Sequence, residues 1–183
     1  DHGIGMTRGS AAAARAAREL FEQGAGAQTV LVGAGDRWSE NAGGASGALW
    51  GAALTAAGNA LGNSDYVDGD LQTAAVNALV DAIQRLGGAQ LGDKTMLDAM
   101  VPFAETFAQA VSQGMTTPVA WQKAADAADA AAAATADLKP RLGRARVLSE
   151  RSIGHADPGA VSFALAARTM AGAVQTARTE EIV

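Results

Sequence analysis

Cysteine is absent from this chain of 183 residues, and its absence excludes two kinds of structure. Neither a disulfide framework nor a thiolate metal site can form, which fits a cytoplasmic protein. Long hydrophobic runs are lacking too, because the alanine tract AAAAATA at 130–136 is too short and too weakly hydrophobic to span a bilayer. We therefore expect a soluble protein with no membrane-spanning segment.

Basic residues are fewer than acidic ones, with 14 Lys and Arg against 19 Asp and Glu. The net charge is -5 and the sequence pI is about 4.9, which argues against binding to a nucleic-acid backbone. A single nucleotide could still be held by local backbone donors. Aromatic residues make up only 4% of the chain, but hydrophobic residues make up 49%, which is enough for one globular domain with a sizeable core. We expect that domain to cover residues 1–183.

A convincing strand pattern is also missing. The apolar stretch TVLVGAG at 29–35 has no second strand to pair with, so we interpret it as a helix or a buried turn. Helical spacing, in contrast, recurs along the chain. Within 73–86, five aliphatic residues share one helical face: Val76, Leu79, Val80, Ile83 and Leu86. Gly87-Gly88 follow and predict the end of this helix.

Two later helices carry clear start signals. Thr117 is a plausible N-cap with Pro118 at the first helical position, and an alanine-rich run of high helix propensity follows. Asp157 and Pro158 repeat the same pattern before another helix.

A further helix is predicted over 95–111, where Pro102 marks a kink or a late start. Its apolar face consists of Met96, Met100, Phe103, Phe107 and Val111. The chain is therefore predicted to be all-α, a bundle of about seven or eight antiparallel helices.

Polar, glycine-containing segments lie between these helices, at 1–5, 41–51, 87–99 and 143–160. In NAGGASGALWG, at 41–51, the glycines allow a close backbone approach to an anion, Ser46 offers a hydroxyl, and a helix N-terminus follows. These features suit a phosphate, without the lysine of a Walker motif. Taken singly, each segment is more typical of a tight helix crossing, a helix cap such as Asp93 or Thr95, or a solvated loop.

Taken together and in order, the segments resemble a known family. The chain is similar to the nucleotide-binding L-type domain of dihydroxyacetone kinases, which occurs as a separate subunit or fused behind a substrate-binding K-type domain. The stretches that carry the resemblance are DHGIGMTRG, GGASGALWG, GDKTMLDAMVPF, GRARVLSERSIGH and DPGA. The resemblance implies an antiparallel eight-helix barrel with the nucleotide at one mouth. It also implies an L-type domain truncated at its N-terminus, since the family's first helix has no counterpart here.

The opening residues correspond to the end of the family's metal-binding signature, in which three aspartates hold two Mg²⁺ ions on the nucleotide phosphates. Asp1 matches the third of these aspartates, and the other two have no counterpart in the chain. Because Mg²⁺ prefers oxygen ligands and bridges phosphates, we expect a metal site reduced to Asp1 to be weak.

The resemblance implies a nucleotide-binding role for residues of all four segments. His2, Gly3, Ile4 and Gly5 match a phosphate contact, and Ala45 with Ser46 match a second one. Gly87, Thr95 and Met96 match residues near the adenine and ribose, and Arg144 matches an arginine that contacts the nucleotide. Asp157, Pro158 and Gly159 match a loop that closes the pocket, whereas His155 suits a structural hydrogen bond better than acid–base chemistry.

The implied activity is phosphoryl transfer from ATP, in which the protein positions phosphates and metal ions and supplies no nucleophile of its own. In the family a histidine of the K-type domain holds the ketose, so this chain alone should bind nucleotide and phosphorylate nothing. Two alternatives stay open: a subunit of a phosphohistidine-dependent phosphotransferase that keeps ADP bound, and a non-catalytic regulatory module. A related fatty-acid kinase domain is disfavoured because it has Asp-Gly-Asp-Thr-Gly where this chain has Asp-His-Gly. The acceptor ketose and a homodimer also stay open.

Overall fold

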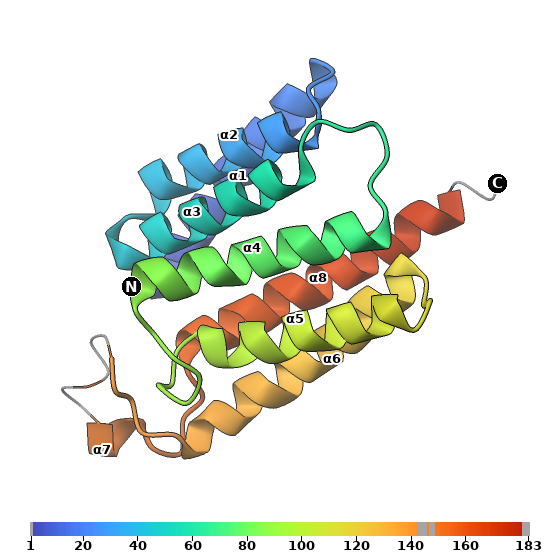
Figure 1. Cartoon of the computed structure of the whole chain (residues 1–183). Coiled ribbons are helices and arrows are strands. Elements are labelled where there is room, and N and C mark those ends of the chain that lie inside the picture. Colours follow the sequence, from blue (N-terminus) through green and yellow to red (C-terminus); the bar gives the residue numbers. More distant parts are fainter. Residues whose placement is uncertain (1, 143–145, 147–148, 181–183) are drawn as a thin grey trace. The chain divides into compact units, whose positions relative to one another are not determined.

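The computed structural model describes residues 2–142, 146 and 149–180, which form helices and no strand (Figure 1). The helices are α1 (His2–Glu22), α2 (Ala27–Ala42), α3 (Gly44–Leu61), α4 (Gly69–Gly87), α5 (Leu97–Ser112), α6 (Thr117–Ala134), the 3-10 turn η1 (Thr135–Asp137), α7 (Ser149–Ser152) and α8 (Pro158–Glu180). The predicted all-α fold is confirmed. The stretch 29–35 lies inside α2, so its interpretation as a helix is correct.

The contacts divide the chain into two compact units, residues 1–88 and residues 89–183. Unit 1 contains α1 to α4, and unit 2 contains α5, α6, η1, α7 and α8. Within each unit, helices that follow one another through short turns run antiparallel and pack together (Figure 1). A single domain over 1–183 stays a prediction. Among the described residues, no helix combines the length and the apolar character that crossing a bilayer requires.

Small residues bring the helices of unit 1 close together. A Cβ atom added to Gly51 in α3 would lie 2.6 Å from the carbonyl oxygen of Gly35 in α2. Farther along the same pair of helices, a Cβ on Gly58 would lie 2.9 Å from the Cβ of Leu31. The helix backbones therefore touch at positions where any larger residue would force them apart.

Aromatic side chains fill the core of unit 2. Phe103 and Phe107 of α5 lie 5.3 Å and 5.4 Å, centroid to centroid, from Trp121 of α6, and Phe163 of α8 meets Phe103 edge-on at 5.4 Å. Phe107 is fully buried. The apolar face predicted for 95–111 is therefore the face that α6 and α8 cover.

Helix boundaries follow the sequence signals with two corrections. α4 ends at Gly87, and Gly88 adopts a left-handed φ of 64° and donates its N–H to the Gln84 carbonyl, as the glycine pair predicts. Thr117 was predicted as an N-cap, but it is the first residue of α6, because Thr116 occupies the cap position with extended φ and ψ. Pro102 lies inside α5, which begins at Leu97, so a late start at this proline is wrong.

Candidate functional site

Two of the predicted site segments, 1–5 and 41–51, meet Gly87 at one end of unit 1. α1 begins, α2 ends, α3 begins and α4 ends at this end, because the four helices alternate in direction (Figure 1). A Cβ on Gly5 would lie 3.0 Å from the carbonyl oxygen of Ala42, so the first turn of α1 touches the last residue of α2. A Cβ on Gly87 would lie 3.5 Å from the side chain of Leu49 in α3.

The turn between α2 and α3 exposes its backbone. Gly43 and Gly44 both have left-handed φ angles, 69° and 63°, which residues with a side chain rarely adopt. A Cβ at either glycine would meet nothing within 4 Å, so a ligand could approach this backbone closely. No side chain caps α3, and its first amides therefore keep their hydrogen-bonding capacity at the positive end of the helix dipole. Ala45 is exposed here and Ser46 is half-buried.

A buried tryptophan fixes where α1 lies on α2. A Cβ on Gly9 would lie 2.6 Å from Nε1 of Trp38 and 2.8 Å from the Cβ of Ala42. Trp38 is 8% exposed and stacks on Trp50 of α3 at a centroid distance of 5.1 Å. Gly5 and Gly9, one turn apart in the opening motif, therefore let α1 lie directly against the end of α2, which brings His2, Gly3 and Ile4 to the same end of unit 1 as the glycine turn.

The other predicted site residues that the structure describes gather at one end of unit 2, where α5 begins, α6 ends and α8 begins (Figure 1): Thr95, Met96, Asp157, Pro158 and Gly159. A Cβ on Gly159 would lie 3.0 Å from the Cβ of Met96. Asp157 caps α8, because its Oδ2 accepts the N–H of Ala160 at 2.8 Å, and Pro158 opens the helix as predicted. The Asp157 N–H donates to Oγ1 of Thr135 at 2.7 Å, which ties the loop to the end of α6.

An aspartate that the sequence reasoning passed over organises the start of α5. Asp98 is buried, and its carboxylate accepts the N–H of Thr95 at 2.7 Å and the N–H of Gly92 at 2.5 Å. The Asp93 carboxylate accepts the N–H of Gln90 at 2.8 Å, so it stabilises the loop before the helix instead of capping α5. Thr95 is half-buried, and its hydroxyl accepts the N–H of Leu97 at 3.3 Å.

Lys94 was also passed over. It is 4% exposed and is the one described non-glycine residue with a left-handed φ, at 61°. Its Nζ donates to the carbonyl oxygens of Leu138 at 3.1 Å and Ser152 at 2.6 Å, with Ala136 at 3.5 Å. The side chain of a lysine in a polar loop is usually solvated, so the sequence does not predict that Lys94 is buried.

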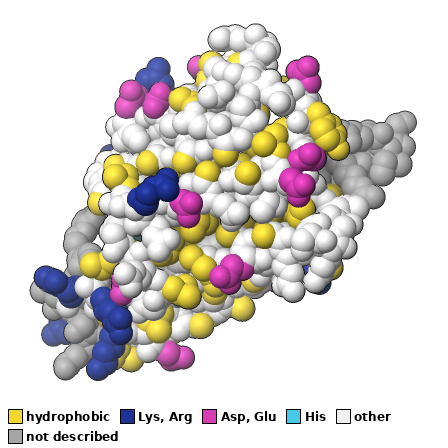
Figure 2. Space-filling view, in the orientation of Figure 1, with side chains coloured by type: hydrophobic (Ala, Val, Ile, Leu, Met, Phe, Trp, Pro, Cys, Tyr) yellow, Lys and Arg dark blue, Asp and Glu magenta, His cyan; other side chains and the backbone are white. Residues whose placement is uncertain are grey.

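Two predicted site residues, Asp1 and Arg144, lie outside the described residues. Among the described residues, no group of three or more His, Asp or Glu side chains could hold a metal ion. Figure 2 shows Lys and Arg side chains gathered at the lower left of the visible face. The end of unit 2 supplies exposed basic residues in this acidic chain: Lys139, Arg141, Arg146 and Arg151.

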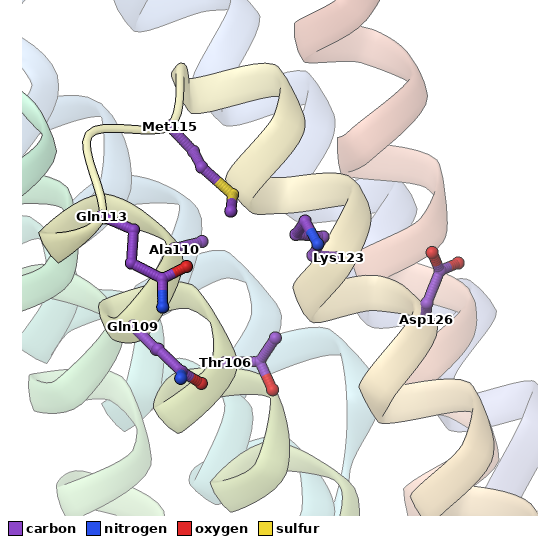
Figure 3. A pocket seen from close by; sticks show the side chains of 7 residues that line it. All are labelled: Thr106, Gln109, Ala110, Gln113, Met115, Lys123 and Asp126. Atoms are coloured by element: carbon purple, nitrogen blue, oxygen red, sulfur yellow. The ribbon is translucent and has the colours of Figure 1, made fainter.

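A shallow cavity of about 350 Å³ lies at the opposite end of α5 and α6 (Figure 3). Its lining comes from both helices and the turn that joins them: Thr106, Gln109, Ala110, Gln113, Met115, Lys123 and Asp126. No predicted site residue lines this cavity, so it is separate from the candidate site.

Helices with an uncapped glycine turn before α3 and an aspartate cap at the start of α8 define a class of helical protein whose open backbone amides suit an anion. The chain belongs to the DAK2 domain family, whose model matches residues 1–172. It is 53% identical over 95% of its length to a D-erythrulose kinase of Mycolicibacterium smegmatis and 45% identical over 90% to an L-erythrulose kinase of Pectobacterium atrosepticum. It spans 30% and 28% of those two relatives.

The fold is also similar to part of a solved kinase. The native dihydroxyacetone kinase of C. freundii matches 89% of this chain with a TM-score of 0.63 and 28% identity, and the match covers 28% of that protein. The same enzyme in complex with AMP-PNP and Mg²⁺ matches with a TM-score of 0.57. An ADP-binding subunit of the PEP-dependent dihydroxyacetone kinase of Escherichia coli is 46% identical over 45% of the chain and 39% of that subunit. The family inferred from the motifs is confirmed.

Proposed function

We propose that this chain is the nucleotide-binding, phosphoryl-transfer domain of a kinase that acts on a short ketose such as erythrulose or dihydroxyacetone. The observation that carries the proposal is the pair of left-handed glycines, Gly43 and Gly44, at the uncapped start of α3 with the first turn of α1 beside it. The names of the relatives and the nucleotide and Mg²⁺ bound to the solved kinase support the same chemistry.

The residues would divide the work between phosphates and nucleoside. Backbone donors of Ala45, Ser46 and the segment 2–5 would hold the phosphates, because amides at a helix N-terminus attract anions. Thr95 and Met96, with Gly87, would lie near the adenine and ribose, and the loop 157–159 would close over them. Arg144 would add a charge-assisted contact. Mg²⁺ would neutralise phosphate charge, with Asp1 as its ligand from this chain.

Transfer of the phosphoryl group needs positioning and charge stabilisation more than covalent help from the protein. This chain would therefore supply the donor half of the reaction, and a K-type domain or subunit would hold the ketose. ATP is the proposed donor, because the erythrulose kinases match over 90% or more of the chain. The phosphohistidine-dependent arrangement is the second candidate, since an ADP-binding subunit of that system matches 45% of the chain.

Substitution of Gly44 by Val tests the phosphate cradle. Val at a φ of 63° is strained and places methyl groups in the open space of the turn, so we expect the affinity for Mg-ADP to fall by at least about tenfold. Gly62→Val is the matched control, because Gly62 has a φ of 65° and lies at the other end of the same helix. Calorimetric titration of both variants measures the effect. Equal affinities in the two variants would exclude the cradle.

A mixing experiment separates the catalytic role from a regulatory one. The chain, ATP, Mg²⁺ and a K-type domain should together convert dihydroxyacetone or erythrulose to a phosphorylated ketose, whereas omission of either protein should stop product formation. Nucleotide binding without any product in the complete mixture would favour the binding module. Replacement of ATP by a phosphohistidine donor protein distinguishes the two candidate donors.

A further inference from the structure

Lys94 holds together a set of chain segments that the reaction chemistry does not explain. Its ammonium is buried and bonds to carbonyl oxygens from two separate places, Leu138 after η1 and Ser152 at the end of α7. Burial of an ammonium costs free energy, and carbonyl oxygens, which carry only a partial charge, offset this cost only in part. We therefore interpret the hydrogen bonds of Lys94 as contacts that organise the surrounding chain segments.

The carbonyls that Lys94 engages also accept backbone hydrogen bonds from the next turn. Ala136 accepts the N–H of Gly154 at 2.9 Å in addition to the Lys94 contact, and Ser152 accepts the N–H of His155 at 3.2 Å. The segment 152–155 is thus attached to η1 and the residue after it through the Lys94 ammonium and the Gly154 N–H. The Lys94 ammonium is therefore a buried cation to which the carbonyl dipoles of separate chain segments point.

The next residues along the chain reach the candidate site. Asp157 is tied to buried Thr135 through its N–H, and its carboxylate caps α8. Gly159 then packs against Met96, two residues after Lys94, at a distance of 3.0 Å for an added Cβ. The contacts close a ring that runs from Lys94 through the end of α6 to the loop 152–159 and back to Met96.

We propose that Lys94 is a positioning residue for the nucleoside end of the nucleotide site. By attaching the segment 152–155 to η1 and the residue after it, its ammonium sets the position of Asp157, Pro158 and Gly159 against Met96. The inference rests on the proposed nucleotide-binding function and deepens it. The Lys94 side chain would contact neither the adenosine part nor the phosphates. Its role would be indirect, and it would affect the recognition of adenosine without affecting that of the phosphates.

The test compares two ligands that share phosphates and differ in the nucleoside. The full chain and Lys94→Met are titrated with Mg-ADP and with Mg-pyrophosphate by calorimetry. Methionine keeps the length of the side chain and removes the charge and its hydrogen bonds. We expect Lys94→Met to weaken Mg-ADP binding by about tenfold or more, the scale of losing bonds to a charged group. Mg-pyrophosphate affinity should stay within about twofold, because it depends on the glycine turn of unit 1 and not on the ring of contacts around Lys94.

Lys139→Met is the matched control. Lys139 is an exposed lysine in the same part of unit 2, so its loss removes one positive charge without touching the ring of contacts. It should leave both affinities within about twofold of the wild-type values. A merely structural role of Lys94 would lower the unfolding midpoint and leave the ratio of the two affinities unchanged, and that result would overturn the inference.

The remaining outcomes are also decisive. If the wild-type chain binds Mg-ADP and Lys94→Met binds it equally well, the positioning role is wrong and the proposed function stands. If the wild-type chain binds neither ligand, the proposed function fails and the positioning role fails with it. If Lys94→Met does not fold, amide exchange in the wild-type chain decides: the amides of 154–160 should be slowed by Mg-ADP and not by Mg-pyrophosphate, and equal slowing would overturn the inference.

Discussion

Unit 1 and unit 2 are both helical, but they differ in the contacts that are most prominent between their helices. In unit 1, glycines let the backbones of α2 and α3 approach, as at Gly35 and Gly51. In unit 2, the aromatic side chains of Phe103, Phe107 and Trp121 fill the space between helices. Unit 1 should therefore be sensitive to added atoms and unit 2 to removed atoms, because close-packed interiors tolerate neither overpacking nor cavities.

The difference extends to the parts of the candidate site. The site residues of unit 1 are mostly glycines and exposed amides, and what they offer a ligand is open backbone at Gly43 and Gly44. Those of unit 2 depend on buried polar side chains, Lys94, Asp98 and Thr135, which shape a loop. Phosphate binding needs accessible donors, whereas the correct placement of a loop needs fixed ones.

Removal of atoms from unit 2 should have the largest effect on stability. Phe107→Ala deletes a fully buried ring in contact with Phe103 and Trp121, so we expect a loss of about 3–5 kcal/mol in the free energy of unfolding, measured with urea. Phe21→Ala, in α1, is the control, because Phe21 is 74% exposed and should change stability by less than about 0.5 kcal/mol. Similar losses in the two variants would contradict the proposed difference between the units.

Addition of atoms to unit 1 should have an intermediate effect. A Cβ at Gly51 would lie 1.8 Å from Oγ of Ser39 and 2.6 Å from the Gly35 carbonyl oxygen, so Gly51→Ala should cost about 1–3 kcal/mol. The same substitution at Gly172, in α8, meets nothing within 4 Å and should stabilise the helix by about 0.5–1 kcal/mol. Urea unfolding of both variants measures whether each substitution lowers or raises the free energy of unfolding. Stabilisation by both substitutions would show that α2 and α3 can separate without cost.

Loss of a surface ion pair in unit 2 should have the smallest effect. Arg168 of α8 donates Nε–H to Asp129 and a second N–H to Asp126, and these bonds raise the pKa of its guanidinium. Because the pKa is higher in the folded state, the ion pair stabilises the protein at every pH below the ordinary arginine range, and this stabilisation is lost only in strong alkali. Its contribution to stability should therefore be constant near neutral pH. Arg168→Gln should lower the unfolding midpoint slightly.

Salt provides the control for this last prediction. The Arg168 side chain is 40% exposed, and exposed charges are screened strongly when the Debye length falls to about 3 Å in 1 M salt. The difference in unfolding midpoint between wild type and Arg168→Gln should therefore shrink as NaCl rises from low concentration to about 1 M. A difference that does not change with salt would point to lost packing of the side-chain stem instead.

Local signals in the sequence predicted most of the helices. The apolar periodicity of 73–86, the glycine pair after it and the Asp157-Pro158 start all correspond to observed elements. The error at Thr117 is one residue, because either of two adjacent threonines can precede a proline at the start of a helix. Pro102 is accommodated inside α5, so proline alone did not decide where that helix begins.

The functional residues also divide into those that the sequence identified and those that it did not. The order of the glycine-rich motifs identified the family, and the family model confirms it over residues 1–172. Asp98 and Lys94 were missed, although both lie in the motif GDKTMLDA. Asp98 accepts the N–H of Thr95 only three residues before it, so a local capping pattern could have identified it. The Lys94 acceptors, in contrast, lie 42 to 58 residues away, and no local pattern relates them.

The sequence by itself determined that the chain is helical, which family it belongs to and which glycines break its helices, because these properties depend on local spacing and backbone freedom. Only the tertiary structure decided what those residues touch. Gly5 and Gly9 became contact points because α2 lies against them, and Lys94 became a buried cation because the end of α6 and the turn after α7 meet around it. Such contacts join residues far apart in the chain, and their energy exists only once the helices have packed.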